Sequence, residues 1–212
     1  LGGVGSYAAE ALVRGGVGRL TIADHDIVSQ SNINRQLYAL NSTIGQYKTE
    51  VAAGRLMDIN PELELHVHCC FFSYETAFNF SSYHYVIDAI DTVSSKLLLA
   101  ECCRESHTPI ISCMGTGNKL NPEKLRIGDI SKTSVCPLAR VMRHELKKRG
   151  IFHLPVVFSD EIPLQYEQPC ISDEETGSRR SVPGSISFVP PVAGMLLASA
   201  VIHALTDGFS SK

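Results

Sequence analysis

The feature that most constrains the fold is a group of glycines at the start of the chain, followed at once by a helical pattern and then by a short apolar strand. Gly2, Gly3 and Gly5 precede residues 6–14, whose apolar side chains recur at helical spacing. Residues 19–24 read RLTIAD, the pattern of a buried parallel strand that ends in an acid. Glycine turn, helix, strand and acid in this order are typical of a Rossmann-type βαβ unit.

Such a unit gives the glycines and the acid defined roles. Gly2, Gly3 and Gly5 would let backbone amides approach a phosphate at the helix N-terminus. Asp24 follows about 20 residues later, the spacing expected of an acid that binds a ribose. The alternatives are a tight turn without a ligand and an acid that only caps its strand, and the combined spacing favours nucleotide binding. Because the chain begins at Leu1, we expect the first strand of the unit to lie before residue 1.

Strand and helix patterns then alternate along the rest of the chain. Strands are predicted at 63–67, 84–88, 109–113, 125–130 and 154–159, and helices at 46–59, 94–106, 137–148 and 190–206. This order predicts an α/β fold with a Rossmann-like, doubly wound, mostly parallel sheet and antiparallel edge strands, in one domain over residues 1–212. Residues 160–184 show no period and are expected to form a mobile loop. The last helix is apolar almost all round, which favours a buried or interface position.

Composition limits the remaining choices. The chain is 44% hydrophobic with a formal net charge of −3, so it can bury a core but lacks the basic excess of a dedicated nucleic-acid binder. Its seven cysteines include no C-x-x-C pair, which favours a reducing cytoplasm over disulfides or zinc. The longest apolar run, residues 192–205, is short for a bilayer, so no stable membrane insertion is expected.

Three short runs carry the chemistry. They are DHDIVSQSNINRQ at 24–36, GQYK at 45–48 and DAIDTVSSK at 88–96. The first resembles the ubiquitin-activating-like superfamily, in which a D-x-D-x-V-x-x-S-N-x-x-R-Q run follows the second strand. The resemblance implies a Mg²⁺- and ATP-dependent adenylating enzyme, with roles for these residues: Asp24 at the ribose, Asn32 near the phosphates, Arg35 and Lys48 on the phosphates, and Asp91 on Mg²⁺.

These implied roles suit the reaction. Adenylation sends a carboxylate oxygen onto the α-phosphorus and expels pyrophosphate, so charge builds on oxygens that fixed cations can stabilise. Arg35 and Lys48 could instead be ordinary solvated surface charges. Asp91 could cap the next helix as well as bind Mg²⁺. Asp88, in the same run, is a structural residue or a neighbour of the nucleotide.

Later segments narrow the resemblance. Activators of sulfur carriers of the MoeB and ThiF type usually carry two C-x-x-C pairs, which this chain lacks. The runs GTGNKLNP at 115–122 and DISKTSVCPLARVMRHELKKRG at 129–150 resemble the tRNA threonylcarbamoyladenosine dehydratase family. That resemblance implies a homodimer that adenylates the threonyl carboxylate of a modified adenosine next to the tRNA anticodon, after which a nucleophile of the same nucleoside closes a ring.

Two other classes stay open. One is an activator of a ubiquitin-like sulfur-carrier protein, whose C-terminal glycine would use the same ATP site. The other is an inactive nucleotide-binding scaffold or an NAD-dependent oxidoreductase. Arg35, Lys48 and Asp91 argue against this second class, because hydride transfer needs no cationic clamp around a γ-phosphate.

Two cysteines and a set of cations are candidates for further roles. Cys136 and Cys170 lie where relatives place a reactive thiol, although a cysteine is more often a small buried hydrophobe. Some family members carry a cysteine linked to a cysteine-desulfurase or sulfur-acceptor system near positions 156–157, where this chain has valines. The candidate tRNA contacts are Arg140, Arg143, Lys147, Lys148, Arg149, Arg179 and Arg180. For residues 147–149, favourable interaction with the helix dipole is the alternative.

Overall fold

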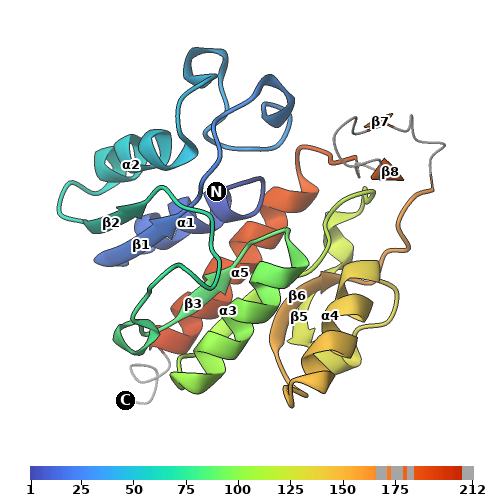
Figure 1. Ribbon diagram of the computed structural model, residues 1–212. Coiled ribbons are helices and arrows are strands. Elements are labelled where there is room, and N and C mark those ends of the chain that lie inside the picture. Colours follow the sequence, from blue (N-terminus) through green and yellow to red (C-terminus); the bar gives the residue numbers. More distant parts are fainter. Residues whose placement is uncertain (166–170, 173–178, 181–183, 207–212) are drawn as a thin grey trace.

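The computed structural model describes residues 1–165, 171–172, 179–180 and 184–206 (Figure 1). Two groups of strands form its centre. Strand β1 (Arg19–Ala23) pairs in parallel with β2 (Glu64–His68). A four-stranded sheet has the order β3 (Val86–Asp88), β4 (Ile110–Cys113), β6 (Pro155–Ser159) and β5 (Leu125–Asp129). Strands β3, β4 and β6 are parallel and β5 is antiparallel at the edge, so the predicted sheet type is confirmed.

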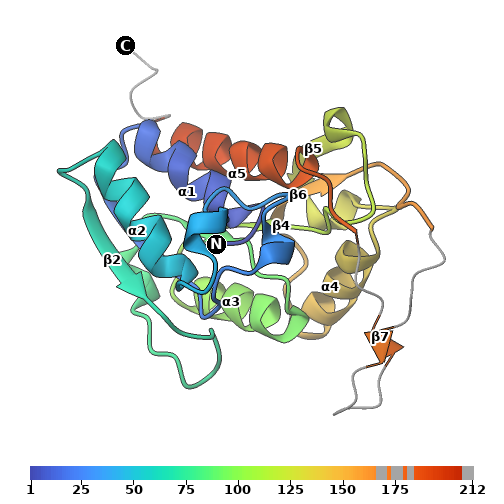
Figure 2. The same ribbon diagram turned by 90° about the horizontal axis from the view of Figure 1, so that it is seen from above.

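Helices cover both faces of the four-stranded sheet (Figure 2). Helices α1 (Gly5–Arg14) and α5 (Val189–Thr206) pack on one face, and α3 (Val93–Glu105) and α4 (Pro137–Lys148) on the other. The strands alternate accordingly, since Ile110 faces α3 and α4 while Ile111 faces α1 and α5. Helix α2 (Lys48–Ile59) packs with α1 over β1 and β2. This is the predicted doubly wound arrangement.

Helix α5 lies unusually close to the start of α1. A Cβ added at Gly194 would stand 2.3 Å from the Val4 carbonyl oxygen and 3.0 Å from the Ala8 nitrogen, so only glycine permits this approach. By length and composition alone α5 could cross a membrane. Here Ala193 and Leu197 are fully buried in the core between the sheet and α1, which fits the buried position expected of an apolar helix.

The predicted boundaries of the main helices and strands hold to within two residues, and the shift at the start of α2 has a tertiary cause. Helix α2 begins at Lys48 rather than at Gln46, because Tyr47 is extended and forms an isolated antiparallel bridge with Ile27. Short 3₁₀ turns occur at Gln30–Asn32, Asn41–Thr43, Phe80–Ser82, Pro122–Lys124 and Ile130–Lys132.

The segment 160–184 contains a short ladder that the sequence did not predict. Strand β7 (Ile171–Ser172) pairs in antiparallel fashion with β8 (Arg179–Arg180). The mobility expected of this segment stays a prediction, and Cys170 lies outside the described residues.

Candidate functional site

A cavity opens at the carboxyl ends of β1, β3 and β4 and continues between β1 and β3. Its wall includes the glycine turn before α1 and the loops that leave the carboxyl ends of β1, β3 and β4, which is where ligands bind in parallel sheets. All predicted site residues except Asp88 line it: Gly2, Gly3, Gly5, Asp24, Asn32, Arg35, Lys48 and Asp91. The fold therefore brings together groups that are up to 89 positions apart in the chain.

The glycine turn offers backbone rather than side chains to this cavity. Helix α1 begins at Gly5, and its N-cap residue, Val4, makes no side-chain capping bond. A Cβ at Gly3 would lie 3.2 Å from Cγ of Arg35 and 3.0 Å from Cβ of Pro190, so a larger residue would displace these neighbours. The turn thus leaves a helix N-terminus open beside Arg35, the local geometry that favours a phosphate.

At the end of β1, acids and a lysine form a linked group. Asp24 Oδ1 accepts a hydrogen bond of 2.9 Å from the backbone nitrogen of Asp26. Lys48, the first residue of α2, is buried and its Nζ lies 2.6 Å from Oδ2 of Asp26. Asp26 therefore fixes the ammonium of Lys48 at the cavity wall.

His25 joins this group, which the sequence reasoning did not foresee. One ligand atom each from Asp24, His25 and Asp26 lies within 4.8 Å of the others, a spacing that a metal ion could bridge. The neighbouring positions of these three residues at the end of β1 were the available sequence signal. Because the Asp26 carboxylate already pairs with the ammonium of Lys48, we assign no metal to the cluster of Asp24, His25 and Asp26.

Asn32 and Arg35 come from the loop between β1 and α2. The Asn32 side chain is buried, and its Oδ1 accepts from the backbone nitrogen of Ser29 at 3.2 Å, which holds the turn. Arg35 Nη1 donates to the Ser31 carbonyl and to Asn34 Oδ1, both at 2.9 Å. Within the described ranges no carboxylate lies within 4 Å of this guanidinium, so its charge is left for a ligand.

Asp88 and Asp91 have opposite surroundings. Asp88 is buried, pairs with Lys96 Nζ at 2.8 Å and accepts from Ser112 Oγ at 2.5 Å. Because these partners occupy its carboxylate beneath the cavity, its contacts support the structural role rather than direct contact with a nucleotide. Asp91 is exposed at the cavity and accepts only a 3.3 Å bond from Thr92 Oγ1 among the described residues.

The capping role considered for Asp91 is wrong. The N-cap residue of α3 is Thr92, and no side chain makes a capping bond there. The Asp91 carboxylate therefore remains available to a cation. Mg²⁺ in nucleotide sites is commonly held by one or two carboxylates together with phosphate oxygens, so the residues present fit this metal.

Two further residues line the cavity that the sequence did not mark as site residues. Lys119 follows β4 and is buried, and its Nζ donates to the Gly115 carbonyl at 2.8 Å. A lysine inside the run GTGNKLNP, directly after a predicted strand, was the available signal. Cys136 is buried at the N-cap of α4 and also lines the wall. Neighbouring Cys113 is an unreactive thiol, because burial raises its pKa to about 12.

The candidate tRNA contacts on α4 separate into two kinds. Arg143 donates to the Thr133 carbonyl at 2.7 Å, Lys148 pairs with Glu145 at 2.6 Å, and Arg149 pairs with both Glu145 and Glu101. In the part of the chain that the structure describes, Arg140 and Lys147 are exposed and make no such contact. They lie seven positions apart and so on one side of the helix. The side chains of Arg179 and Arg180 lie outside the described residues.

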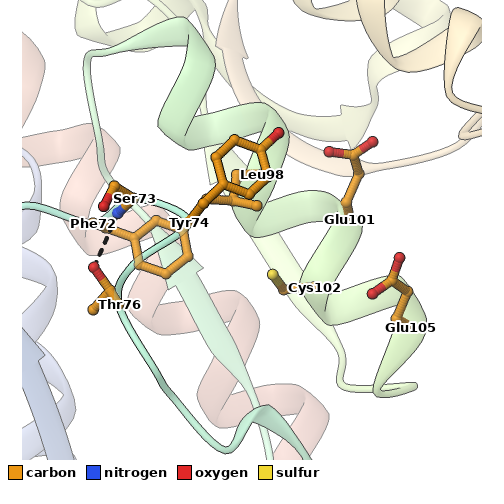
Figure 3. A pocket seen from close by; sticks show the side chains of 8 residues that line it. All are labelled: Phe72, Ser73, Tyr74, Thr76, Leu98, Glu101, Cys102 and Glu105. Carbon is orange, nitrogen blue, oxygen red and sulfur yellow. Dashed lines mark hydrogen bonds between the residues drawn. The ribbon is translucent and has the colours of Figure 1, made fainter.

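A second, smaller hollow of about 400 Å³ lies on the outer side of α3 (Figure 3). It is lined by aromatic and acidic side chains such as Tyr74, Glu101 and Glu105. A hydrogen bond of 3.1 Å from the Ser73 nitrogen to Thr76 Oγ1 shapes its rim. No predicted site residue reaches this hollow, so the chemistry resides in the larger cavity.

Comparison with known proteins identifies relatives of this chain in sequence and in structure. The model of the ThiF family matches residues 1–211. The tRNA threonylcarbamoyladenosine dehydratase of Bacillus subtilis is 43% identical over 100% of this chain and 87% of its own length. The Haemophilus influenzae protein of the same name is 36% identical over 97% of this chain and 83% of its own. The crystal structure of the Escherichia coli enzyme in complex with ATP superposes with a TM-score of 0.84 at 32% identity, covering 100% of this chain and 85% of that one.

The chain therefore belongs to the ThiF family and, within it, to the tRNA threonylcarbamoyladenosine dehydratases. The resemblance drawn from the short sequence runs is confirmed. The match to both halves of the chain, including the segments after β4, also distinguishes it from relatives that share only the nucleotide motifs.

Proposed function

We propose that this protein removes one water from N6-threonylcarbamoyladenosine in tRNA, next to the anticodon, by adenylating the threonyl carboxylate with ATP in the cavity between β1 and β3. The observation that carries the proposal is the gathering of the glycine turn, Arg35, Lys48 and Asp91 around one cavity, in a chain similar over its full length to dehydratases of this name. We treat residues 1–212 as one adenylation domain.

Each residue has a defined task in this proposal. Asp24 would accept hydrogen bonds from the ribose hydroxyls, and the glycine turn and Asn32 would bind phosphate oxygens. Arg35 and Lys48 would stabilise the negative charge that develops as the carboxylate oxygen attacks the α-phosphorus and pyrophosphate leaves. Asp91 would hold Mg²⁺, and the metal would supply positive charge that offsets part of the charge of the phosphates.

The second half of the reaction needs no enzyme thiol. A nucleophile of the same nucleoside attacks the activated carbonyl, the bond to the AMP oxygen breaks, and AMP carries away the oxygen that came from the carboxylate. Because the nucleophile is already tethered to the carbonyl, its effective concentration is high. Cys136, although it lines the cavity, is therefore not required. A cysteine-desulfurase or sulfur-acceptor partner stays a prediction that the described cysteines do not support.

We further propose that the protein acts as a cytoplasmic homodimer. Large apolar side chains around the loop that carries Arg35 are exposed: Ile27, Ile33, Leu40, Ile44 and Tyr47. A second copy seated on this surface would cover these side chains, and a homodimer is what the family resemblance implies. The exposed Arg140 and Lys147 on α4 are the proposed contacts to tRNA phosphates.

The test is mass spectrometry of nucleosides after incubation with ATP, Mg²⁺ and tRNA that bears threonylcarbamoyladenosine. The wild-type protein should convert the nucleoside to a product lighter by one water, only when ATP is present. Arg35→Ala and Asp91→Asn should lower the rate at least about 100-fold, as expected when a charge-stabilising group is lost. Arg126→Ala, which changes an exposed arginine on the edge strand β5, is the matched control.

One result would favour the alternative activity, which is the activation of a sulfur-carrier protein. This result is an unchanged nucleoside combined with exchange of pyrophosphate into ATP only when a small ubiquitin-like carrier protein is added. Both reactions share the adenylation step, so loss of exchange in Arg35→Ala alone does not separate them, whereas the substrate requirement does.

A further inference from the structure

Three lysines are buried in the described part of the chain, and their partners differ. Lys48, Lys96 and Lys119 expose 4%, 0% and 2% of their surface. Lys48 pairs with Asp26 at 2.6 Å, and Lys96 pairs with Asp88 at 2.8 Å. Lys119 has one hydrogen bond, to the Gly115 carbonyl at 2.8 Å, and no carboxylate of the described residues lies within 4 Å of its Nζ.

A buried ammonium without a counter-charge is unfavourable, because it has lost water and gained no anion. Burial accordingly lowers the pKa of Lys119. The acid of the same region is committed elsewhere, since Glu161 accepts from the backbone nitrogens of Leu120 at 3.0 Å and Asn121 at 2.9 Å. An ammonium has three donors, and the Gly115 carbonyl takes one. Among the described residues the Lys119 site therefore leaves donors free for an anion, and an anion bound there would favour the charged form of this lysine.

The backbone around Lys119 holds this ammonium in place. Asn118 adopts a positive φ of 57°, and its backbone nitrogen donates to the Gly184 carbonyl at 2.7 Å. In return the Gly184 nitrogen donates to Asn118 Oδ1 at 2.7 Å, and the Leu164 nitrogen donates to the Asn118 carbonyl at 2.7 Å. Three bonds to two other segments thus fix the residue next to Lys119. A preorganised cation loses little freedom when it binds a ligand.

The position of Lys119 suggests which anion it meets. The groups assigned to the nucleotide come from the glycine turn, the end of β1 and the loop after β3. Lys119 follows β4, the next strand of the sheet, and so lies beyond Asp91 as seen from Asp24. It lines the same cavity, on the side away from the ribose acid. The anion that must reach the phosphates from that side is the carboxylate to be adenylated.

We propose that Lys119 binds the substrate carboxylate and holds it for attack on the α-phosphorus. The identity of this carboxylate as a threonyl group of tRNA rests on the proposed function, whereas the anion site itself rests on the burial and contacts of Lys119. Its ammonium would donate two charge-assisted hydrogen bonds to the carboxylate oxygens and lose them when the group becomes an acyl adenylate.

The test compares two forms of one tRNA, the first with threonylcarbamoyladenosine and the second with its carboxylate converted to a neutral methylamide. Without ATP, the wild-type protein should bind the carboxylate form about tenfold more tightly, the size of one hydrogen bond to a charged group. Lys119→Met should lose this preference, while its Kd for ATP stays unchanged. Lys124→Met, at an exposed position of the following turn, is the matched control and should keep the preference.

Two outcomes would overturn the proposal. One is a Lys119→Met protein that keeps the carboxylate preference. The other is a weakened Kd for ATP with the preference intact, which would make Lys119 a phosphate ligand. Should Lys119→Met fail to fold, Lys119→Gln keeps a donor for the Gly115 carbonyl and carries the same test. Failure of the dehydratase assignment is recognised separately, because the wild-type protein would then leave the nucleoside unchanged.

Discussion

The two ends of the cavity treat positive charge differently. At the end of β1, Lys48 is held by a carboxylate of its own chain, and beneath β3 the buried Lys96 has Asp88. At the end of β4, Lys119 is equally buried but has only a carbonyl oxygen among the described residues. A paired lysine has its position and charge fixed by the fold, whereas an unpaired one gains its counter-charge only when a ligand arrives. The first arrangement stabilises the fold, whereas the second leaves the lysine able to bind a ligand.

The largest expected effect concerns the pair beneath the cavity. Lys96→Met leaves the Asp88 carboxylate buried without its cation, which should lower the free energy of unfolding by about 3–5 kcal/mol. Urea denaturation measures this. Lys119→Met removes no partner of a carboxylate and should cost much less. Equal losses of unfolding free energy in the two variants would contradict the distinction between paired and unpaired lysines. Recovery of stability in the double variant Lys96→Met/Asp88→Asn would support it.

At the end of β1 the effect should appear in binding. Lys48→Met should weaken ATP binding by about 1.5–3 kcal/mol, as expected for the loss of a hydrogen bond to a charged group. Its effect on folding should be smaller than that of Lys96→Met, because Asp26 is half exposed and water can solvate it. Calorimetric titration with ATP provides the measurement. Lys132→Met, at an exposed lysine, is the control. Unchanged affinity would refute the role given to Lys48.

The acid near Lys119 predicts a dependence on pH. Burial alone would raise the pKa of Glu161, but hydrogen bonds from Leu120 and Asn121 outweigh it and the pKa lies below its usual 4.5. The stability that these bonds contribute is thus complete above about pH 4.5 and is lost as the pH falls through the folded-state pKa. Thermal unfolding between pH 7 and pH 3 should show wild type and Glu161→Gln converging in Tm at low pH. The Tm of Glu123→Gln, a change at an exposed neighbouring position, should vary with pH in the same way as the wild-type Tm.

The smallest effect is expected on the surface of α4. Replacing Arg140 and Lys147 by alanine should weaken tRNA binding several-fold and reduce the salt dependence of log K by about 1–2. Lys148→Ala should change both less, because Lys148 is already engaged with Glu145. Filter binding at several salt concentrations makes the comparison. An equal effect of all three cations would mean that internal pairing does not decide which of them reach the tRNA.

The fold could be predicted from the sequence because the signals for helices, strands and turns are local. Periodicity and turn residues located every main helix and strand, and Pro137–Lys148 was predicted with its boundaries. The start of α2 was missed by two residues, because the bridge between Tyr47 and Ile27 joins segments twenty positions apart. The paired strands β7 and β8 were missed because each is only two residues long.

For the site, spacing identified the residues that we propose to act directly, but not those whose importance depends on their surroundings. Arg35, Lys48 and Asp91 stand in recognisable runs and do line one cavity. The pairing of Asp88 with Lys96 was not foreseen, although both stand in DAIDTVSSK, because it depends on how the loop folds over the helix. Lys119 was missed for a stronger reason. Its significance lies in the absence of a nearby carboxylate among the described residues, which depends on the positions of all its neighbours.

The contact between Gly194 and the Val4 carbonyl has a consequence for biosynthesis. A ribosome makes the glycine turn well before helix α5, yet the turn reaches its final packing only against that helix. While the intervening residues are being translated, the core face of α1 lacks its cover and the phosphate-binding amides have no rigid support. The nascent chain should thus acquire ATP binding late and abruptly, once residues 189–206 have left the exit tunnel. A truncation before α5 should abolish ATP binding although it deletes none of the residues proposed to bind the nucleotide.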